Sequence, residues 1–195
     1  RGDRVAIYLE KRLETVIAMF AVSAAGGVFV PINHVLKAAQ VEHILADSGT
    51  RVLFTSPERL SLLAPAMTRC AVEQVVLVGR HSDGATGSDA GPDMRPWKVD
   101  LGQQAPTFEA AAVIDNDAAA ILYTSGSTGR PKGVVLSHRN LIVGAESVSS
   151  YLSNTADDVI LSVLPLSFDA GLSQVTTAFA VGAHCVLTNF LLPAE

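Results

Sequence analysis

The sequence has few cysteines and no basic clusters, and each shortage excludes a class of protein. Its two cysteines, Cys70 and Cys185, are too few for a disulfide framework and lie outside any metal-binding spacing, so reduced, buried thiols in a reducing cytoplasm are expected. Fourteen Lys and Arg residues against 19 Asp and Glu give a net charge of -5, and no basic run exceeds the pair Lys11 and Arg12. A nucleic-acid-binding surface is therefore not expected.

The sequence also lacks an uninterrupted apolar run of membrane-spanning length. Its longest apolar stretch, residues 15–32, contains Ser23, Gly26 and Gly27 and meets Pro31. Glycine and proline favour turns, so this stretch indicates a helix, a turn and a strand. The chain opens on the polar run RGDR without Met or a signal peptide. A cytoplasmic protein, present here as part of something longer, is the expectation.

Apolar runs alternate with helical patterns along the sequence, which predicts βα units on mainly parallel sheets, an α/β fold. The strands are near-continuous in Val, Leu and Ile, which indicates burial on both faces. The expected strands cover residues 4–9, 27–32, 51–56, 74–79, 118–124, 133–138, 158–165 and 184–188. The expected helices cover residues 13–26, 38–49 (closed by Gly49), a segment from Pro57 behind a Ser56 cap, 139–152 and 171–182. In the first helix the apolar period is Val16, Ile17, Phe20 and Ala24.

Composition divides the chain into three parts. Residues 1–80 are predicted to form a first α/β subdomain, and residues 111–195 a second α/β portion. Between them, residues 81–110 are rich in Gly, Ser, Asp and Pro, which predicts a solvent-exposed connector. Its single tryptophan, Trp97, is expected to anchor the connector to the core.

Residues 121–138, ILYTSGSTGRPKGVVLSH, place a polar loop between two apolar runs. The loop combines four hydroxyl side chains, two glycines and two cations: Thr124, Ser125, Ser127, Thr128, Gly126, Gly129, Arg130 and Lys132. Glycines let backbone N–H groups approach an anion, while hydroxyls and cations bind it. A phosphate-binding loop is predicted, with a Ser/Gly-rich hairpin turn between strands as the alternative.

Two common phosphate loops are excluded by spacing. A Walker A loop counted from Gly126 would need Gly, Lys and a hydroxyl where the sequence has Pro131, Lys132 and Gly133, so the second glycine and the magnesium-binding hydroxyl are both missing. The dinucleotide fingerprint fails as well, because its glycines need a different spacing and a helix, not a strand, must follow.

The segment YTSGSTGRPKGV resembles the signature of the AMP-forming adenylating enzymes: acyl-CoA synthetases, adenylation domains of nonribosomal peptide synthetases and luciferases. GDRVAIYL, AAGGVFVPIN, HILADSGTRVLFT and LPLSFDAGLSQ resemble other stretches of that family in the same order. The likeness implies part of the large N-terminal domain of an adenylate-forming enzyme, with the C-terminal domain absent. YLEKRLETVIAMF resembles acyl-CoA ligases found beside bacterial exosortase genes.

The resemblance implies a two-step reaction with ATP, Mg²⁺ and coenzyme A, or with the phosphopantetheine of an acyl carrier protein. A small carboxylic acid or amino acid is activated as an acyl-adenylate and passed to the thiol. Thr124 and Lys132 would act catalytically, and residues 124–129 with Lys132 would hold the β- and γ-phosphates. The family's adenine, ribose and magnesium blocks lie beyond residue 195, so this chain alone is not expected to turn over or to bind ATP tightly. A non-catalytic phosphate-binding module is the alternative.

The segment LPLSFDAG implies the substrate end, with Phe168, Asp169 and Gly171 as substrate-binding residues. Many acyl ligases carry histidine where Phe168 stands, whereas amino-acid-activating domains carry Phe-Asp, with the aspartate pairing to the substrate ammonium. A helix N-cap role for Asp169 is the alternative.

The remaining polar candidates carry structural interpretations. Five histidines are not spaced as metal ligands, which predicts surface or capping roles for His34, His43, His81, His138 and His184. Asp115 and Asp117 precede a strand and are interpreted as turn residues.

Overall fold

The structure is a computed structural model that describes residues 1–79, 91–98, 107–125 and 130–189. Strands and helices alternate along these residues, as the apolar pattern predicts. They are β1 (Arg4–Tyr8), α1 (Leu13–Ala24), β2 (Val28–Pro31), α2 (Ala38–Ser48), β3 (Val52–Thr55), α3 (Pro57–Met67), β4 (Gln74–Leu77), β5 (Asp93–Pro96), β6 (Ala118–Ser125), β7 (Pro131–Ser137), α5 (His138–Leu152), β8 (Val159–Ser162), α6 (Asp169–Val181) and β9 (His184–Leu187).

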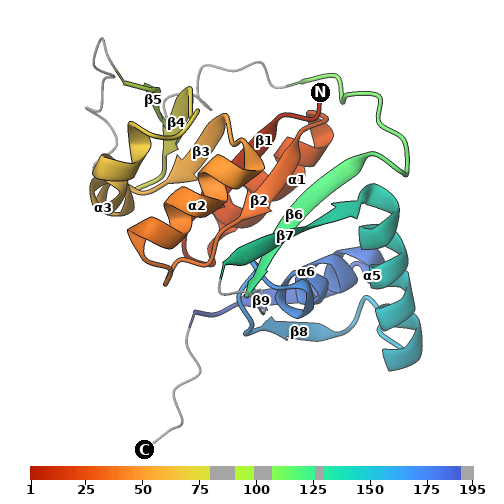
Figure 1. Ribbon diagram of the computed structural model, residues 1–195. Helices are drawn as coiled ribbons and strands as arrows, with labels where there is room; N and C mark the ends of the chain where they lie inside the picture. Colours follow the sequence, from red (N-terminus) through yellow and green to blue (C-terminus); the bar gives the residue numbers. More distant parts are fainter. Residues whose placement is uncertain (80–90, 99–106, 126–129, 190–195) are drawn as a thin grey trace, which may run out of the picture.

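Seven strands form one sheet in the order β5-β4-β3-β1-β2-β6-β7. Every neighbouring pair is parallel except β6 and β7, which are antiparallel. A second sheet pairs β8 with β9 in parallel and lies with α5 and α6 beside the β6–β7 end of the large sheet (Figure 1). The α/β fold with mainly parallel sheets is confirmed. Because β6 pairs with β2, the portion after residue 111 contributes strands to the sheet begun by residues 1–80; the three-part domain division stays a prediction.

The large sheet is buried on both faces at its centre, as its apolar strands predict. Alternate residues of β1 enter different clusters: Val5 and Ile7 pack toward α1 and α6, whereas Ala6 and Tyr8 pack toward α2 and α3. Burial of roughly 25 cal/mol for each Å² of apolar surface is the main stabilising contribution in such a core. Helices on both faces therefore hold the central strands in place.

The predicted connector contains a short strand that was not expected, β5, formed by Asp93–Pro96. This strand pairs in parallel with β4 at the sheet edge, where a proline is tolerated because its missing N–H faces outward. Two of its four residues, Asp93 and Arg95, are charged, so the strand lacks the apolar run that indicates a buried strand. The Trp97 anchor is confirmed: its ring meets Phe54 edge-on with centroids 5.8 Å apart.

The apolar period of α1 does not fully coincide with its buried residues. Ile17 is 51% exposed, whereas Ala18 and Met19 are buried. The helix is apolar on most sides, so apolar periodicity alone does not single out the face that is buried.

Several local predictions are confirmed. Gly49 ends α2 in the left-handed conformation, with φ 61°, and Ser56 Oγ accepts a 3.3 Å hydrogen bond from Arg59 N at the start of α3. Asp117 lies in a turn, where its carboxylate accepts a hydrogen bond from Ile114 N. Cys70 and Cys185 are free thiols but only half-buried, and burial raises the pKa of both.

One exposed arginine joins the amino ends of three adjacent strands. Arg51, just before β3, donates to both carboxylate oxygens of Glu73 ahead of β4 and to Asp3 ahead of β1. These charge-assisted hydrogen bonds lower the pKa of Glu73 and of Asp3. All three side chains meet solvent, so the stabilisation is small and sensitive to salt.

We predict that Arg51→Gln destabilises the protein more at pH 7 than at pH 3. The folded-state pKa values of Asp3 and Glu73 are depressed, so their contribution is present above their unfolded values, roughly 4, and is lost as pH falls through the folded values. Urea unfolding at both pH values, with Arg139→Gln as a charge-matched control, measures the difference. An equal effect at pH 7 and pH 3 would contradict the prediction.

Candidate functional site

The predicted phosphate loop joins β6 to β7, and we call these two strands and the residues between them the loop hairpin. In its antiparallel register Thr124 lies opposite Lys132, and Ser125 lies opposite Pro131. Thr124 and Lys132 are exposed, so the structure brings the two predicted catalytic residues together at the base of the loop. Gly126, Ser127, Thr128 and Gly129 lie outside the described residues.

The direction of β6 decides where the loop hairpin opens. Because β6 runs parallel to β2, its carboxyl end lies at the same sheet edge as the carboxyl ends of β1, β2 and β3 (Figure 1). Open α/β sheets bind their ligands outside the carboxyl ends of the strands. The alternative interpretation, a hairpin between two strands, therefore agrees with the antiparallel pairing of β6 and β7. The hairpin nevertheless lies at the carboxyl ends of the parallel strands, where such sheets bind ligands.

Helix α2 contacts both strands of the loop hairpin. Tyr123 Oη of β6 donates a 2.6 Å hydrogen bond to Asp47 Oδ2, and His43 Nε2 lies 3.1 Å from the Pro131 carbonyl oxygen of β7. Burial first, and then Asp47, raises the pKa of Tyr123, so its hydroxyl stays protonated and donating. Sequence reasoning missed these contacts because α2 and the hairpin are far apart in the chain; the only local signal is the spacing of His43 and Asp47 by one helical turn.

The predicted substrate residues gather at the start of α6. Phe168 is the N-cap position and makes no side-chain cap bond, while Asp169 is the first helical residue. The N-cap interpretation of Asp169 is therefore wrong by one position: its Oδ1 accepts from Ala170 N at 2.7 Å, and its negative charge lies at the helix's positive end. No hydrogen bond or ion pair joins this group to Thr124 or Lys132 in the described part of the chain.

Gly171 occupies a position with no space for a side chain. A Cβ built on it would lie 2.0 Å from the Pro165 carbonyl oxygen, so the turn before α6 packs directly on the helix backbone. This close approach fixes the backbone of the first turn of α6, which carries Asp169.

A groove between α5 and α6 runs past Asp169. Its volume is about 620 Å³, within the range of small-molecule sites. Polar side chains from both helices line part of it, namely Asn140, Tyr151, Asn154, Asp169, Ser173, Gln174, Thr176 and Thr177. Asp169, one of the predicted substrate residues, therefore lines a cavity large enough for a small molecule.

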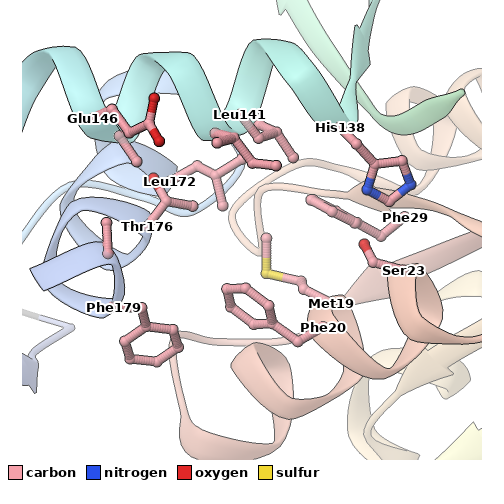
Figure 2. A pocket seen from close by; sticks show the side chains of 13 residues that line it. Met19, Phe20, Ser23, Phe29, His138, Leu141, Glu146, Leu172, Thr176 and Phe179 are labelled. Atoms are coloured by element: carbon pink, nitrogen blue, oxygen red, sulfur yellow. The ribbon is translucent and has the colours of Figure 1, made fainter. Parts of the chain in front are cut away.

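A second, more apolar pocket of about 430 Å³ lies between α1, α5 and α6. Figure 2 shows Met19, Phe20, Phe29 and Phe179 around it, with His138 at one end. His138 opens α5 and does not cap a strand as predicted; its buried Nε2 has no hydrogen-bond partner among the described residues. It follows the end of β7 remote from the loop, about 20 Å of extended strand from Lys132. This pocket is therefore separate from the loop hairpin.

The described residues meet neither the requirements of a three-ligand metal site nor those of a helical membrane span. Among the described residues no group of three His, Cys, Asp or Glu side chains is placed to hold a metal ion. His34, His43, His138 and His184 lie on separate segments, and His81 lies outside the described residues. No helix in the described ranges has both the length and the apolar character of a membrane span.

Comparison with known proteins defines the class. The fold is an α/β sheet whose candidate loop opens at its carboxyl edge, and the family model described as "AMP-binding enzyme" matches residues 1–193. The chain belongs to the AMP-binding enzyme family, whose members similar to it include acyl-CoA ligases and nonribosomal peptide synthetases.

Two relatives illustrate the range of activities. The chain is 34% identical over 196 residues to a human mitochondrial malonate–CoA ligase, covering 100% of this chain and 31% of that protein. It is 33% identical over 183 residues to an L-proline–[L-prolyl-carrier protein] ligase of Streptomyces coelicolor, covering 93% and 34%. The chain thus spans about a third of the length of these curated relatives.

A solved structure agrees with the fold. The anthranilate CoA ligase AuaEII in complex with anthranoyl-AMP superposes with a TM-score of 0.87 at 27% identity, covering 97% of this chain and 36% of that one. The described residues therefore adopt the fold of part of an adenylate-forming enzyme's N-terminal domain.

We predict that Gly171→Ala destabilises the protein by about 2 kcal/mol, because the new methyl group must displace the Pro165 carbonyl. Gly144→Ala in α5 is the matched control: an added Cβ there meets nothing within 4 Å, and alanine stabilises a helix interior by up to about 1 kcal/mol. Chemical denaturation of both variants measures the two effects. A Gly171→Ala variant as stable as the wild type would refute the packing argument.

Proposed function

We propose that the complete protein is an AMP-forming acid–thiol ligase. The substrate carboxylate attacks the α-phosphorus of ATP, the bond to pyrophosphate breaks, and an acyl-adenylate forms. The sulfur of coenzyme A then attacks the acyl carbon, releasing AMP and leaving a thioester. Membership of the AMP-binding enzyme family and the CoA ligases among its relatives support this reaction.

The observation that carries the proposal is the pairing of Thr124 with Lys132 at the carboxyl edge of the sheet. In the proposal the Lys132 ammonium and the Thr124 hydroxyl bind the β- and γ-phosphates, together with Ser125, Ser127, Thr128 and the backbone at Gly126 and Gly129. Negative charge grows on pyrophosphate as the P–O bond breaks, and fixed donors at that position stabilise the transition state more than the bound substrate.

The described residues supply only the phosphate end of the proposed ATP site. They include no acidic cluster for a metal ion, so a role for Mg²⁺ stays a prediction, as does a cytoplasmic location. The chain spans about a third of its curated relatives, and we propose that it binds ATP weakly by itself. Low affinity follows because adenine and ribose contacts would come from elsewhere.

The proposed substrate is a small carboxylic acid, held in the groove between α5 and α6 that Asp169 lines. Phe168 and Gly171 shape the same end of α6. A second candidate is an amino acid loaded onto a carrier-protein thiol. The exposed Asp169 carboxylate favours it, because a carboxylate at that place can pair with a substrate ammonium, and the L-proline ligase is a relative of that kind.

We predict that Lys132→Ala in the full-length protein lowers kcat/KM for adenylation by 10² to 10³, on the order of 3 to 4 kcal/mol of transition-state stabilisation. Pyrophosphate release across a panel of acids and amino acids is the measurement. Lys98→Ala is the control, since Lys98 follows β5, which lies at the other end of the strand order from β6 and β7. A Lys132→Ala protein that adenylates at the wild-type rate would remove the assigned role.

We predict that Asp169→Asn separates the two substrate classes. Asparagine still accepts from Ala170 N but carries no charge, so amino-acid substrates should lose about 100-fold in kcat/KM through the lost ion pair, while acids without an amino group keep their rate. Asp115→Asn, a change of the same chemistry in a surface turn, should leave both classes unaffected. Equal losses for both classes would argue against an ammonium-binding role.

A further inference from the structure

We infer that helix α2 positions the loop hairpin for catalysis, with Tyr123, Asp47 and His43 as positioning residues. This inference rests on the proposed function, because it assumes that Thr124 and Lys132 bind phosphate. None of the three side chains needs to touch ATP. They act by holding the backbone from which the two phosphate-binding residues project.

The first contact fixes β6. Tyr123 immediately precedes Thr124, and its hydroxyl donates to the Asp47 carboxylate at 2.6 Å. Hydrogen bonds to a charged acceptor are among the stronger ones in proteins. The half-buried ring adds packing against the α2 side of the sheet, so the residue beside Thr124 is held by both ends of its side chain.

The second contact fixes β7. His43 Nε2 donates to the Pro131 carbonyl oxygen at 3.1 Å, because a carbonyl can only accept. Pro131 immediately precedes Lys132. His43 and Asp47 are four residues apart and therefore project from one face of α2. A single helix face thus contacts both strands, next to each of the two candidate phosphate ligands.

Glycine at position 133 makes room for the first contact. Gly133 lies opposite Tyr123 in the hairpin register, and a Cβ built on it would lie 3.1 Å from Tyr123 Cζ and 2.7 Å from the Ile121 side chain. The Tyr123 ring therefore lies over Gly133, and its hydroxyl reaches Asp47. Lys132 is held between an anchored Pro131 and a Gly133 covered by that ring.

Helix α2 is itself fixed to the core, so the contacts have a rigid base. Val41, Ile44 and Leu45 are almost fully buried. At its end, Arg4 of β1 donates to the carbonyl oxygens of Ser48 and Gly49 at 2.7 and 2.8 Å. Hydrogen bonds therefore connect the central strand β1 to α2, and α2 to the loop hairpin.

The test compares two half-reactions of the full-length protein. Tyr123→Phe and His43→Ala should raise KM for ATP in pyrophosphate release about tenfold, because small misplacement of a phosphate ligand is costly. Thiolysis of the preformed acyl-adenylate by coenzyme A, which involves no pyrophosphate, should be unchanged. His43→Gln and Asp47→Asn keep a donor and an acceptor respectively, so each should retain near-wild-type KM.

Tyr8→Phe is the matched control, since it removes a buried hydroxyl that donates to Leu36 O at 2.9 Å away from the hairpin, and it should not change KM for ATP. Hydrogen exchange over residues 130–137 should rise in Tyr123→Phe and His43→Ala only. Should Tyr123→Phe fold poorly, Asp47→Ala changes the same contact at an exposed position.

Unchanged KM values, or equal losses in both half-reactions, overturn the positioning role while leaving the proposed function standing. A wild-type protein that releases no pyrophosphate with any acid overturns the proposed function, and the positioning role with it.

Discussion

The parallel pairing of β6 with β2 is the constraint on which the candidate site depends. The pair is aligned where Phe29 meets Ala120, and it points the carboxyl end of β6 toward the edge shared by β1, β2 and β3. The antiparallel return of β7 then places Lys132 opposite Thr124 at that edge. Reversal of β6 would move the loop to the amino ends of the strands, away from the usual ligand edge of such sheets.

Contacts between distant segments then hold the two parts of the candidate site, the loop hairpin and the start of α6. Helix α2 holds the loop hairpin through Tyr123 and His43. Lys11 follows β1, and its Nζ donates a 2.7 Å hydrogen bond to Ser162 O of β8. Its backbone also exchanges hydrogen bonds with the Asn189 side chain, just after β9. These bonds tie the β8–β9 sheet, against which α6 packs, to the end of β1. Burial lowers the pKa of Lys11, a cost that the bond to Ser162 offsets.

Prediction from the sequence succeeded where local chemistry decides the outcome. The Gly49 cap, the adenylating-enzyme signature and each apolar run of the βα alternation are contained in short stretches of adjacent residues. Prediction was incomplete where packing decides: β5 is a polar edge strand that exists by pairing with β4, and the apolar period of α1 does not indicate that Ala18 is buried while Ile17 is exposed. His138 begins a helix because Ser137 Oγ accepts the capping hydrogen bond from Asn140 N, and this local signal was present in the sequence but missed.

The sequence by itself determined the fold class, the family and the identity of the candidate phosphate ligands, because periodicity and the spacing from Thr124 to Lys132 are properties of the chain. Only the tertiary structure decided that these two residues face each other and that α2 holds them from both strands. It also decided that Asp169 begins α6 above a turn too close to Gly171 for any side chain. These arrangements come from hydrogen bonds and packing between segments far apart in the chain, which no local pattern encodes.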